Sequence, residues 1–245
     1  MKLVVAYDGT AFHGWQRQPA QRTVQEELET KLSTAMGEPV KVTGAGRTDA
    51  GCHARGQVAS FTTGARLPAS ALVPVLNHSL PDDVRVRSAA EAPAGFDARR
   101  SALARRYVYR LLGAEDVLLA RFAWHPRRAF DPDRLTRATA ALEGEHDCAV
   151  FQASGSSAVG SRCRVMRAAW RRWEGGVQLD IVADHFLYHM VRSIVGTALA
   201  LQDERDPGAA MRERLRAGDR AGAGPTAPAQ GLCLEEVFYP REAGA

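Results

Sequence analysis

The residues from Gly44 to Gly56 place one carboxylate, Asp49, in a glycine-rich segment between two stretches of strand-like sequence. Glycines allow positive φ angles and a close approach of a bulky ligand. The arginines Arg47 and Arg55 supply positive charge, which favours the ionised form of a nearby aspartate. An aspartate among glycines is also a common turn residue that bonds its own backbone. These residues alone therefore allow either a catalytic acid or a turn.

The spacing of the glycines argues against two nucleotide-binding motifs. Counted from Gly44, the dinucleotide fingerprint needs a third glycine where Asp49 stands. Counted from Gly46, the phosphate-loop spacing is followed by Cys52 and His53 in place of Lys and Ser or Thr. We therefore expect a loop that presents an acid and not one that holds nucleotide phosphates.

Positive charge is concentrated well beyond the +4 of the whole chain. Residues 99–128 hold eight arginines against two acidic residues, and Tyr107, Tyr109 and Trp124 lie among them. Arginine interleaved with aromatic side chains suits phosphate contact and base stacking in RNA recognition. The same composition also occurs on a solvated protein face, so nucleic-acid binding is indicated only modestly.

The composition is that of an ordinary globular protein: 245 residues, 45% of them hydrophobic. No leader or membrane-spanning segment is evident, which predicts a cytoplasmic protein. The four cysteines are scattered without a Cys-x-x-Cys pair, so we expect neither a disulfide framework nor a metal site.

The first half of the chain predicts strands and helices that position Asp49. Residues 2–7 are typical of a buried strand, and a helix begins after Thr23, with Glu26 completing a capping box, and ends at Gly37. Short strands are predicted at 40–43 and 57–62, which places Asp49 between two extended segments. A helix at 68–80 and a strand at 84–91 follow.

The second half repeats this mixture from about residue 104. Alternation over 104–112 places Arg105, Tyr107 and Tyr109 on one face of a strand. A capped helix begins at residues 131–132 and ends at Gly144, and a hairpin is predicted for 162–173 and 177–183. A long apolar helix that begins at Phe186 contains Arg192, which either reaches solvent or pairs with a buried carboxylate. One short helix is predicted within 206–229 and a strand at 231–239. The fold class is therefore α+β, with domains at 1–104 and 105–245. We expect the two domains to be docked with a cleft between them.

Several ordered motifs together resemble the TruA family of tRNA pseudouridine synthases. They are Tyr7-Asp8-Gly9-Thr10, Gly14-Trp15-Gln16, Gly46-Arg47-Thr48-Asp49-Ala50-Gly51, Phe96-Asp97-Ala98, Arg105-Arg106-Tyr107, Met190-Val191-Arg192 and Thr226-Ala227-Pro228-Ala229. They extend over almost the whole chain. Two departures stand out: Cys52 replaces a usual aliphatic residue, and residues 162–164 match a family strand only loosely.

The resemblance implies two similar mixed α/β domains, each an antiparallel sheet with helices on one side, around a basic cleft. It also implies a homodimeric isomerase, without cofactor or metal, that converts uridine to pseudouridine at positions 38–40 in the anticodon stem-loop of tRNA after flipping the base. Carried over by position, the catalytic aspartate is Asp49, the substrate-contacting tyrosine is Tyr107, and the arginine that pairs with the aspartate is Arg192. Arg47, Arg105 and Arg106 are expected to bind the substrate.

Two other classes of protein fit parts of the sequence. An RNA-binding module or tRNA chaperone would use the same arginines and aromatic residues without chemistry, and analysis of the reaction product would distinguish it. A carboxylate-dependent hydrolase would need a second acid opposite Asp49, and no neighbouring carboxylate is an obvious partner.

Overall fold

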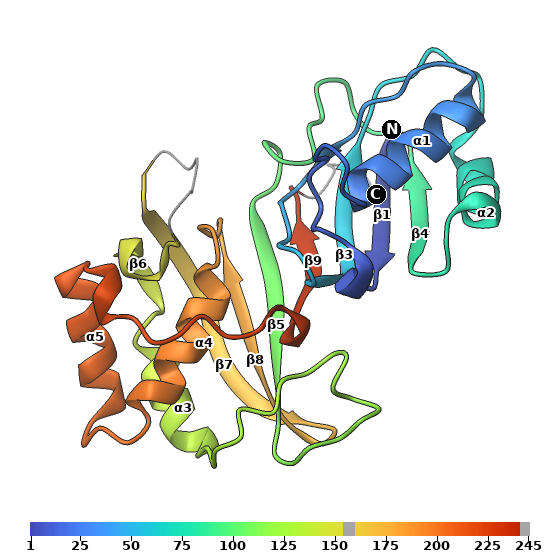
Figure 1. Ribbon diagram of the computed structural model, residues 1–245. Helices are drawn as coiled ribbons and strands as arrows, with labels where there is room; N and C mark the ends of the chain where they lie inside the picture. Colours follow the sequence, from blue (N-terminus) through green and yellow to red (C-terminus); the bar gives the residue numbers. More distant parts are fainter. Residues whose placement is uncertain (154–159, 241–245) are drawn as a thin grey trace. The chain divides into compact units, whose positions relative to one another are not determined.

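The computed structural model describes residues 1–153 and 160–240, which form two compact units (Figure 1). The first unit comprises Met1–Leu103 together with the chain from Leu234 onward, and the second comprises Ala104–Cys233. A division into 1–104 and 105–245 does not anticipate that the last strand joins the first unit. The Leu103 amide donates to the Phe238 carbonyl oxygen at 2.8 Å, which ties this strand to the end of the first unit's main segment.

The first unit is an antiparallel sheet with two helices. Its elements are β1 (Lys2–Tyr7), α1 (Val24–Met36), β2 (Thr43–Gly44), β3 (His53–Ser60), α2 (Ala69–Ser79), β4 (Val84–Ala90) and β9 (Leu232–Phe238). Strand β1 lies between β4 and β3, and β2 pairs with β3. Side chains from β1, α1 and α2 form a core that is closed to solvent: Leu3, Val5, Leu28, Leu32, Leu72 and Leu76. Helices α1 and α2 therefore cover one face of this sheet (Figure 1).

The second unit is also an antiparallel sheet with helices over one face (Figure 1). Its elements are β5 (Ala104–Leu112), α3 (Pro132–Ala140), β6 (Gly144–Asp147), β7 (Arg162–Trp173), β8 (Gly176–Ala183), α4 (Met190–Leu201) and α5 (Pro207–Ala217). The strand order is β5-β8-β7-β6. The expected fold class, two mixed α/β units each built on an antiparallel sheet, is confirmed. Within the described ranges, none of the helices is long and apolar enough to cross a membrane.

Two expected features of the first unit are absent for identifiable reasons. Residues 40–42 are not a strand, because the Val40 amide is bonded by the Ser33 hydroxyl at 2.9 Å and the Val42 amide by the Glu29 carboxylate at 3.2 Å. The capping box of α1 does not form: Thr23 Oγ1 has no hydrogen-bond partner in the described part of the chain, and Glu26 pairs with Arg17 at 3.2 Å.

Two boundaries in the second unit also differ from expectation. Helix α4 begins at Met190 and not at Phe186, because His189 adopts a left-handed conformation with φ of 61° that interrupts the helix. The residue expected to end α3, Gly144, opens β6 instead, where it pairs with Val165.

Candidate active site

Asp49 lies in a loop between β2 and β3, residues 45–52, which we call the Asp49 loop. The Ala45 amide donates to the Val58 carbonyl at 2.8 Å at one end, and the Cys52 amide donates to the main-chain carbonyl of Asp49 at 3.1 Å at the other. The Gly51 amide also donates to the Phe12 carbonyl at 3.2 Å. The backbone on both sides of Asp49 is thus fixed by hydrogen bonds, while the residue itself is half-buried.

Thr48, the residue before Asp49, is held on two sides. Its hydroxyl is 2.8 Å from the Tyr7 hydroxyl, and its carbonyl accepts from the Trp15 amide at 3.0 Å. A glycine is required beside it, because Gly14 has a φ of +89° and a Cβ there would lie 2.7 Å from the Thr48 carbonyl oxygen. The segment that carries Trp15 therefore lies directly against the backbone of the Asp49 loop.

Gln57 holds the other side of the loop from strand β3. Its Nε2 atom donates to the Gly46 carbonyl at 2.8 Å and, more weakly, to the Tyr7 hydroxyl at 3.5 Å. Its Oε1 atom accepts from the Val58 amide at 3.2 Å, which fixes the orientation of the side-chain amide. All three side chains, those of Tyr7, Thr48 and Gln57, are buried, so they form one internal polar network under the loop.

His53, the first residue of β3, makes contacts that stabilise the fold. His53 Nδ1 accepts from the Gly9 amide at 3.1 Å and lies 3.2 Å from an Asp8 carboxylate oxygen. His53 therefore links the loop that follows β1 to the start of β3.

A cysteine and a histidine lie close together in the second unit. Cys163 Sγ lies 3.4 Å from His185 Nε2. The thiols of Cys148 and Cys163 form a hydrogen bond, which lowers the pKa of Cys148 and raises the pKa of Cys163. Burial raises the pKa of Cys163 further. Across residues 1–153 and 160–240, no three histidine, cysteine, aspartate or glutamate side chains are grouped so that they could hold a metal ion.

Tyr107 lies on β5 in the second unit, opposite Ile181 of β8, and is buried. Its ring meets the ring of Phe186 edge-on, with centroids 5.0 Å apart and planes at 80°. Phe186 belongs to the connection between β8 and α4, so this connection fixes the position of the Tyr107 ring. A ring held in this way keeps one orientation, which suits a side chain that stacks on a base.

Arg192 lies in α4, where every residue except Arg192 and Ala200 is buried. Its Nε atom donates to the Ala227 carbonyl at 2.7 Å, and its own carbonyl accepts from the Ala227 amide at 3.1 Å. The chain at 223–228 can lie this close because α4 has Gly196, where a Cβ would be 1.6 Å from the Pro225 carbonyl oxygen. The 223–228 segment and Arg192 therefore hold one another in place.

The adjacent arginines of β5 have separate roles. Arg105 donates to the Asp184 carbonyl at 2.8 Å. Arg106 lies on the sheet face opposite Tyr107, where its Nη2 atom is 2.5 Å from the fully buried carboxylate of Asp180. Arg171 of β7 contacts the same carboxylate at 3.1 Å. By contrast, Arg47 in the Asp49 loop is exposed.

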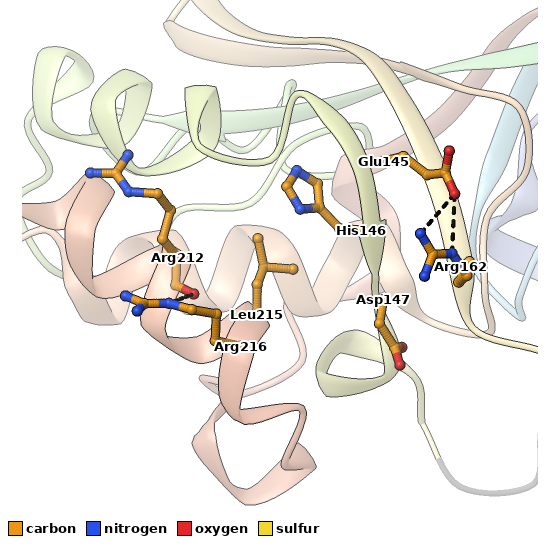
Figure 2. Close-up of a pocket in the computed structure, with 7 residues that line it drawn as sticks. All are labelled: Glu145, His146, Asp147, Arg162, Arg212, Leu215 and Arg216. Atoms are coloured by element: carbon orange, nitrogen blue, oxygen red, sulfur yellow. Dashed lines mark hydrogen bonds and ion pairs between the residues drawn. The ribbon is translucent and has the colours of Figure 1, made fainter.

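The predicted site residues thus divide between the units: Asp49 and Arg47 in the first, Tyr107, Arg105, Arg106 and Arg192 in the second. Sequence reasoning did not assign a role to the network beneath the Asp49 loop. One signal was present, because Tyr7 belongs to one of the ordered motifs that resemble the TruA family. A hollow of about 370 Å³ lies apart from these residues in the second unit and is lined by both acidic and basic side chains of β6, β7 and α5, including Glu145, Arg162 and Arg212 (Figure 2).

Comparison with known proteins identifies the family. A family model described as tRNA pseudouridine synthase matches residues 3–99 and 138–240. A tRNA pseudouridine synthase A of Geotalea uraniireducens is 43% identical over 242 residues, covering 98% of this chain and 99% of the relative. Proteins of the same name from Moorella thermoacetica and Brevibacillus brevis are each 42% identical over 243 residues, with 98% of this chain and 99% of the relative covered. This chain therefore belongs to the tRNA pseudouridine synthase family.

Proposed function

We propose that this chain converts uridine to pseudouridine at positions 38–40 in the anticodon stem-loop of tRNA, with Asp49 as the catalytic carboxylate. Family membership supports the reaction, and the relatives named above are tRNA pseudouridine synthases. The observation that carries the assignment of Asp49 is the way in which its loop is held. Hydrogen bonds from β1, β3 and the Trp15 segment fix the backbone on both sides of this one carboxylate.

The reaction breaks the bond between N1 of uracil and C1′ of ribose, turns the base, and rejoins it through C5. It involves no net redox change and needs no cofactor. The enzyme must first take the uridine out of its stack, which costs a few kcal/mol. Asp49 acts in its ionised form, whether it attacks C1′ or C6 or removes a ribose proton.

The remaining roles follow from the side-chain chemistry. Tyr107 offers a ring in a fixed orientation for stacking on the flipped uracil. Arg192 supplies a positive charge to pair with the Asp49 carboxylate, the pairing that the resemblance to the TruA family implies. Arg47, which is exposed on the Asp49 loop, binds a phosphate near the target, and Arg105 contributes further positive charge to substrate binding. Arg106 lies on the other face of β5 and pairs with Asp180, so we expect a smaller contribution to substrate binding from Arg106.

We also propose that the enzyme works as a homodimer in the cytoplasm. The resemblance to the TruA family supports the dimer. Sedimentation of the purified protein tests it: we expect a species near twice the 26.5 kDa chain mass, and a single species at the chain mass would contradict it.

Product mapping tests the proposed reaction. The purified protein is incubated with an unmodified tRNA transcript that has uridine at positions 38, 39 and 40, and pseudouridine is located by carbodiimide labelling. A matched transcript with cytidine at these positions is the control. We expect modification confined to these positions of the first transcript. Binding of both transcripts without any pseudouridine would instead support an RNA-binding module. Modification at other uridines would overturn the assignment of positions 38–40.

A further inference from the structure

We infer that Tyr7 is a positioning residue for the reaction: through its hydroxyl contact with Thr48 it sets the placement of Asp49. This inference rests on the proposed function, in which Asp49 is the catalytic carboxylate. Thr48 precedes Asp49 directly, so any movement of Thr48 moves the Asp49 main chain. A misplacement of about 1 Å at a reacting group can reduce a rate by about a hundredfold.

Gln57 is a second hydrogen-bond partner of the Tyr7 hydroxyl. A side-chain amide nitrogen only donates, so Gln57 Nε2 donates to the Tyr7 oxygen at 3.5 Å. The Tyr7 hydroxyl also pairs with Thr48 Oγ1 at 2.8 Å, where either hydroxyl can be the donor. Gln57 cannot turn to replace this contact, because its Oε1 is held by the Val58 amide and its Nε2 by the Gly46 carbonyl.

Tyr7 lies at an irregularity in the pairing of β1 with β3. The pairing of β1 with β3 changes register between Val5, which pairs with Gln57, and Tyr7, which pairs with Ala54. This bulge, of the kind that re-aims side chains in sheets, lies at the strand end from which the Tyr7 hydroxyl reaches the loop. The ring itself packs against Trp15 at a centroid distance of 6.2 Å. A phenylalanine would keep that packing and remove only the hydroxyl.

Packing alone does not require the hydroxyl. Tyr7 is 5% exposed and Thr48 is 6% exposed, so both oxygen atoms have been withdrawn from water. Burying two polar groups is unfavourable unless they are paired, and a satisfied buried pair rigidifies its surroundings. The contact spans 41 positions in sequence and joins a sheet strand to the residue adjoining Asp49, which is where rigidity would serve the chemistry.

The test compares Tyr7→Phe with Tyr239→Phe in the full-length protein. The control also loses one tyrosine hydroxyl from the first unit, because Tyr239 donates to the Ala98 carbonyl at 2.7 Å. We expect Tyr7→Phe to lower the single-turnover rate at saturating enzyme about tenfold or more, with the dissociation constant for tRNA within twofold of wild type. Tyr239→Phe should keep the wild-type rate, even if both variants melt at a similarly reduced temperature.

Variants of Thr48 separate positioning from general damage to the fold. Thr48→Val should reproduce the loss of rate, Thr48→Ser should restore the rate to within twofold of wild type, and the double variant Tyr7→Phe/Thr48→Val should lose no more than either single variant. A wild-type rate in Tyr7→Phe, an equal loss in Tyr239→Phe, or additive losses in the double variant would each overturn the inference. Absence of pseudouridine with the wild-type protein would instead refute the proposed function, so the two failures are distinguishable.

Discussion

The Asp49 loop and the 223–228 segment are held in different ways. In the first unit, neighbouring side chains hold the loop, through the Tyr7 hydroxyl on Thr48 and the Gln57 amide on Gly46. In the second unit, Arg192 itself holds the segment through its contact with Ala227. Substituting Asp49 therefore leaves these supporting contacts intact, whereas substituting Arg192 removes a proposed catalytic charge together with a contact that stabilises the fold.

The largest effect on this comparison is expected from Arg192→Ala. The proposed isomerisation rate should fall about a hundredfold, and the free energy of unfolding should fall by about 2 kcal/mol, because a hydrogen bond from a charged group is lost. Arg192→Lys keeps the charge but not the planar donor, so its rate should lie between those of the wild type and Arg192→Ala.

The control for this substitution is Arg216→Ala, which removes an exposed arginine of α5 in the same unit. Rates and thermal melting of the three variants are measured together. A wild-type melting curve for Arg192→Ala would show that the arginine does not hold the segment.

The next effect is expected from Gly196→Ala in α4. Replacing glycine by alanine in a helix normally stabilises it by roughly 1 kcal/mol. Here the new Cβ would lie 1.6 Å from the Pro225 carbonyl oxygen, so the 223–228 segment must move. We therefore expect the free energy of unfolding to fall by about 2–3 kcal/mol. Denaturant unfolding measures it, and Gly222→Ala, whose Cβ would meet only the flexible Arg214 side chain at 3.3 Å, should be near neutral. Stabilisation by Gly196→Ala would contradict the close packing of α4 against the 223–228 segment.

The helix caps provide a smaller test of the difference between the units. Asp131 of the second unit accepts from the amides of Asp133 and Arg134 at the start of α3, so Asp131→Ala should cost about 1 kcal/mol. Thr23 of the first unit makes no such bond, so Thr23→Val should leave stability unchanged or raise it by up to about 1 kcal/mol. A loss of more than about 1 kcal/mol in Thr23→Val would restore the capping interpretation.

The smallest effect concerns the acid dependence of stability. The side chain of Ser161, and then the Ala149 amide, hold the pKa of Asp147 below its usual value. A depressed native pKa means that the stabilisation is present above the unfolded pKa, about 3.9, and is lost as the pH falls through the native pKa. The stability difference between wild type and Asp147→Asn, measured by denaturant unfolding, should thus be constant above about pH 5 and shrink below about pH 4. A difference that grows in acid would contradict this assignment.

The sequence predicts the elements whose signals are local. The alternation in β5, the turn between β7 and β8, and the cap of α3 all depend on residues close together in the chain, and each of these elements forms. Residues 40–42 were predicted wrongly, because their amides are bonded by side chains of α1 that the strand pattern does not reveal.

The same limit applies to the candidate site. The position of Asp49 between two extended segments follows from local glycines and strand patterns, and the structure places it between β2 and β3. The partnership of Tyr7 with Thr48 depends on the register of β1 against β3 and on the bulge within it. Register of this kind is set by the packed sheet, so a contact between residues 41 positions apart cannot be deduced from their neighbours alone.

The central claim, that Asp49 carries out the chemistry, is tested most directly by Asp49→Asn. Asparagine keeps the shape of the side chain and removes its charge, and Asp82→Asn is a matched control because Asp82 is an exposed carboxylate of the same unit. Single-turnover formation of pseudouridine and tRNA binding are measured for both. We predict no isomerisation by Asp49→Asn with tRNA affinity near that of wild type, and full activity of Asp82→Asn. Turnover by Asp49→Asn within tenfold of the wild-type rate would contradict the claim.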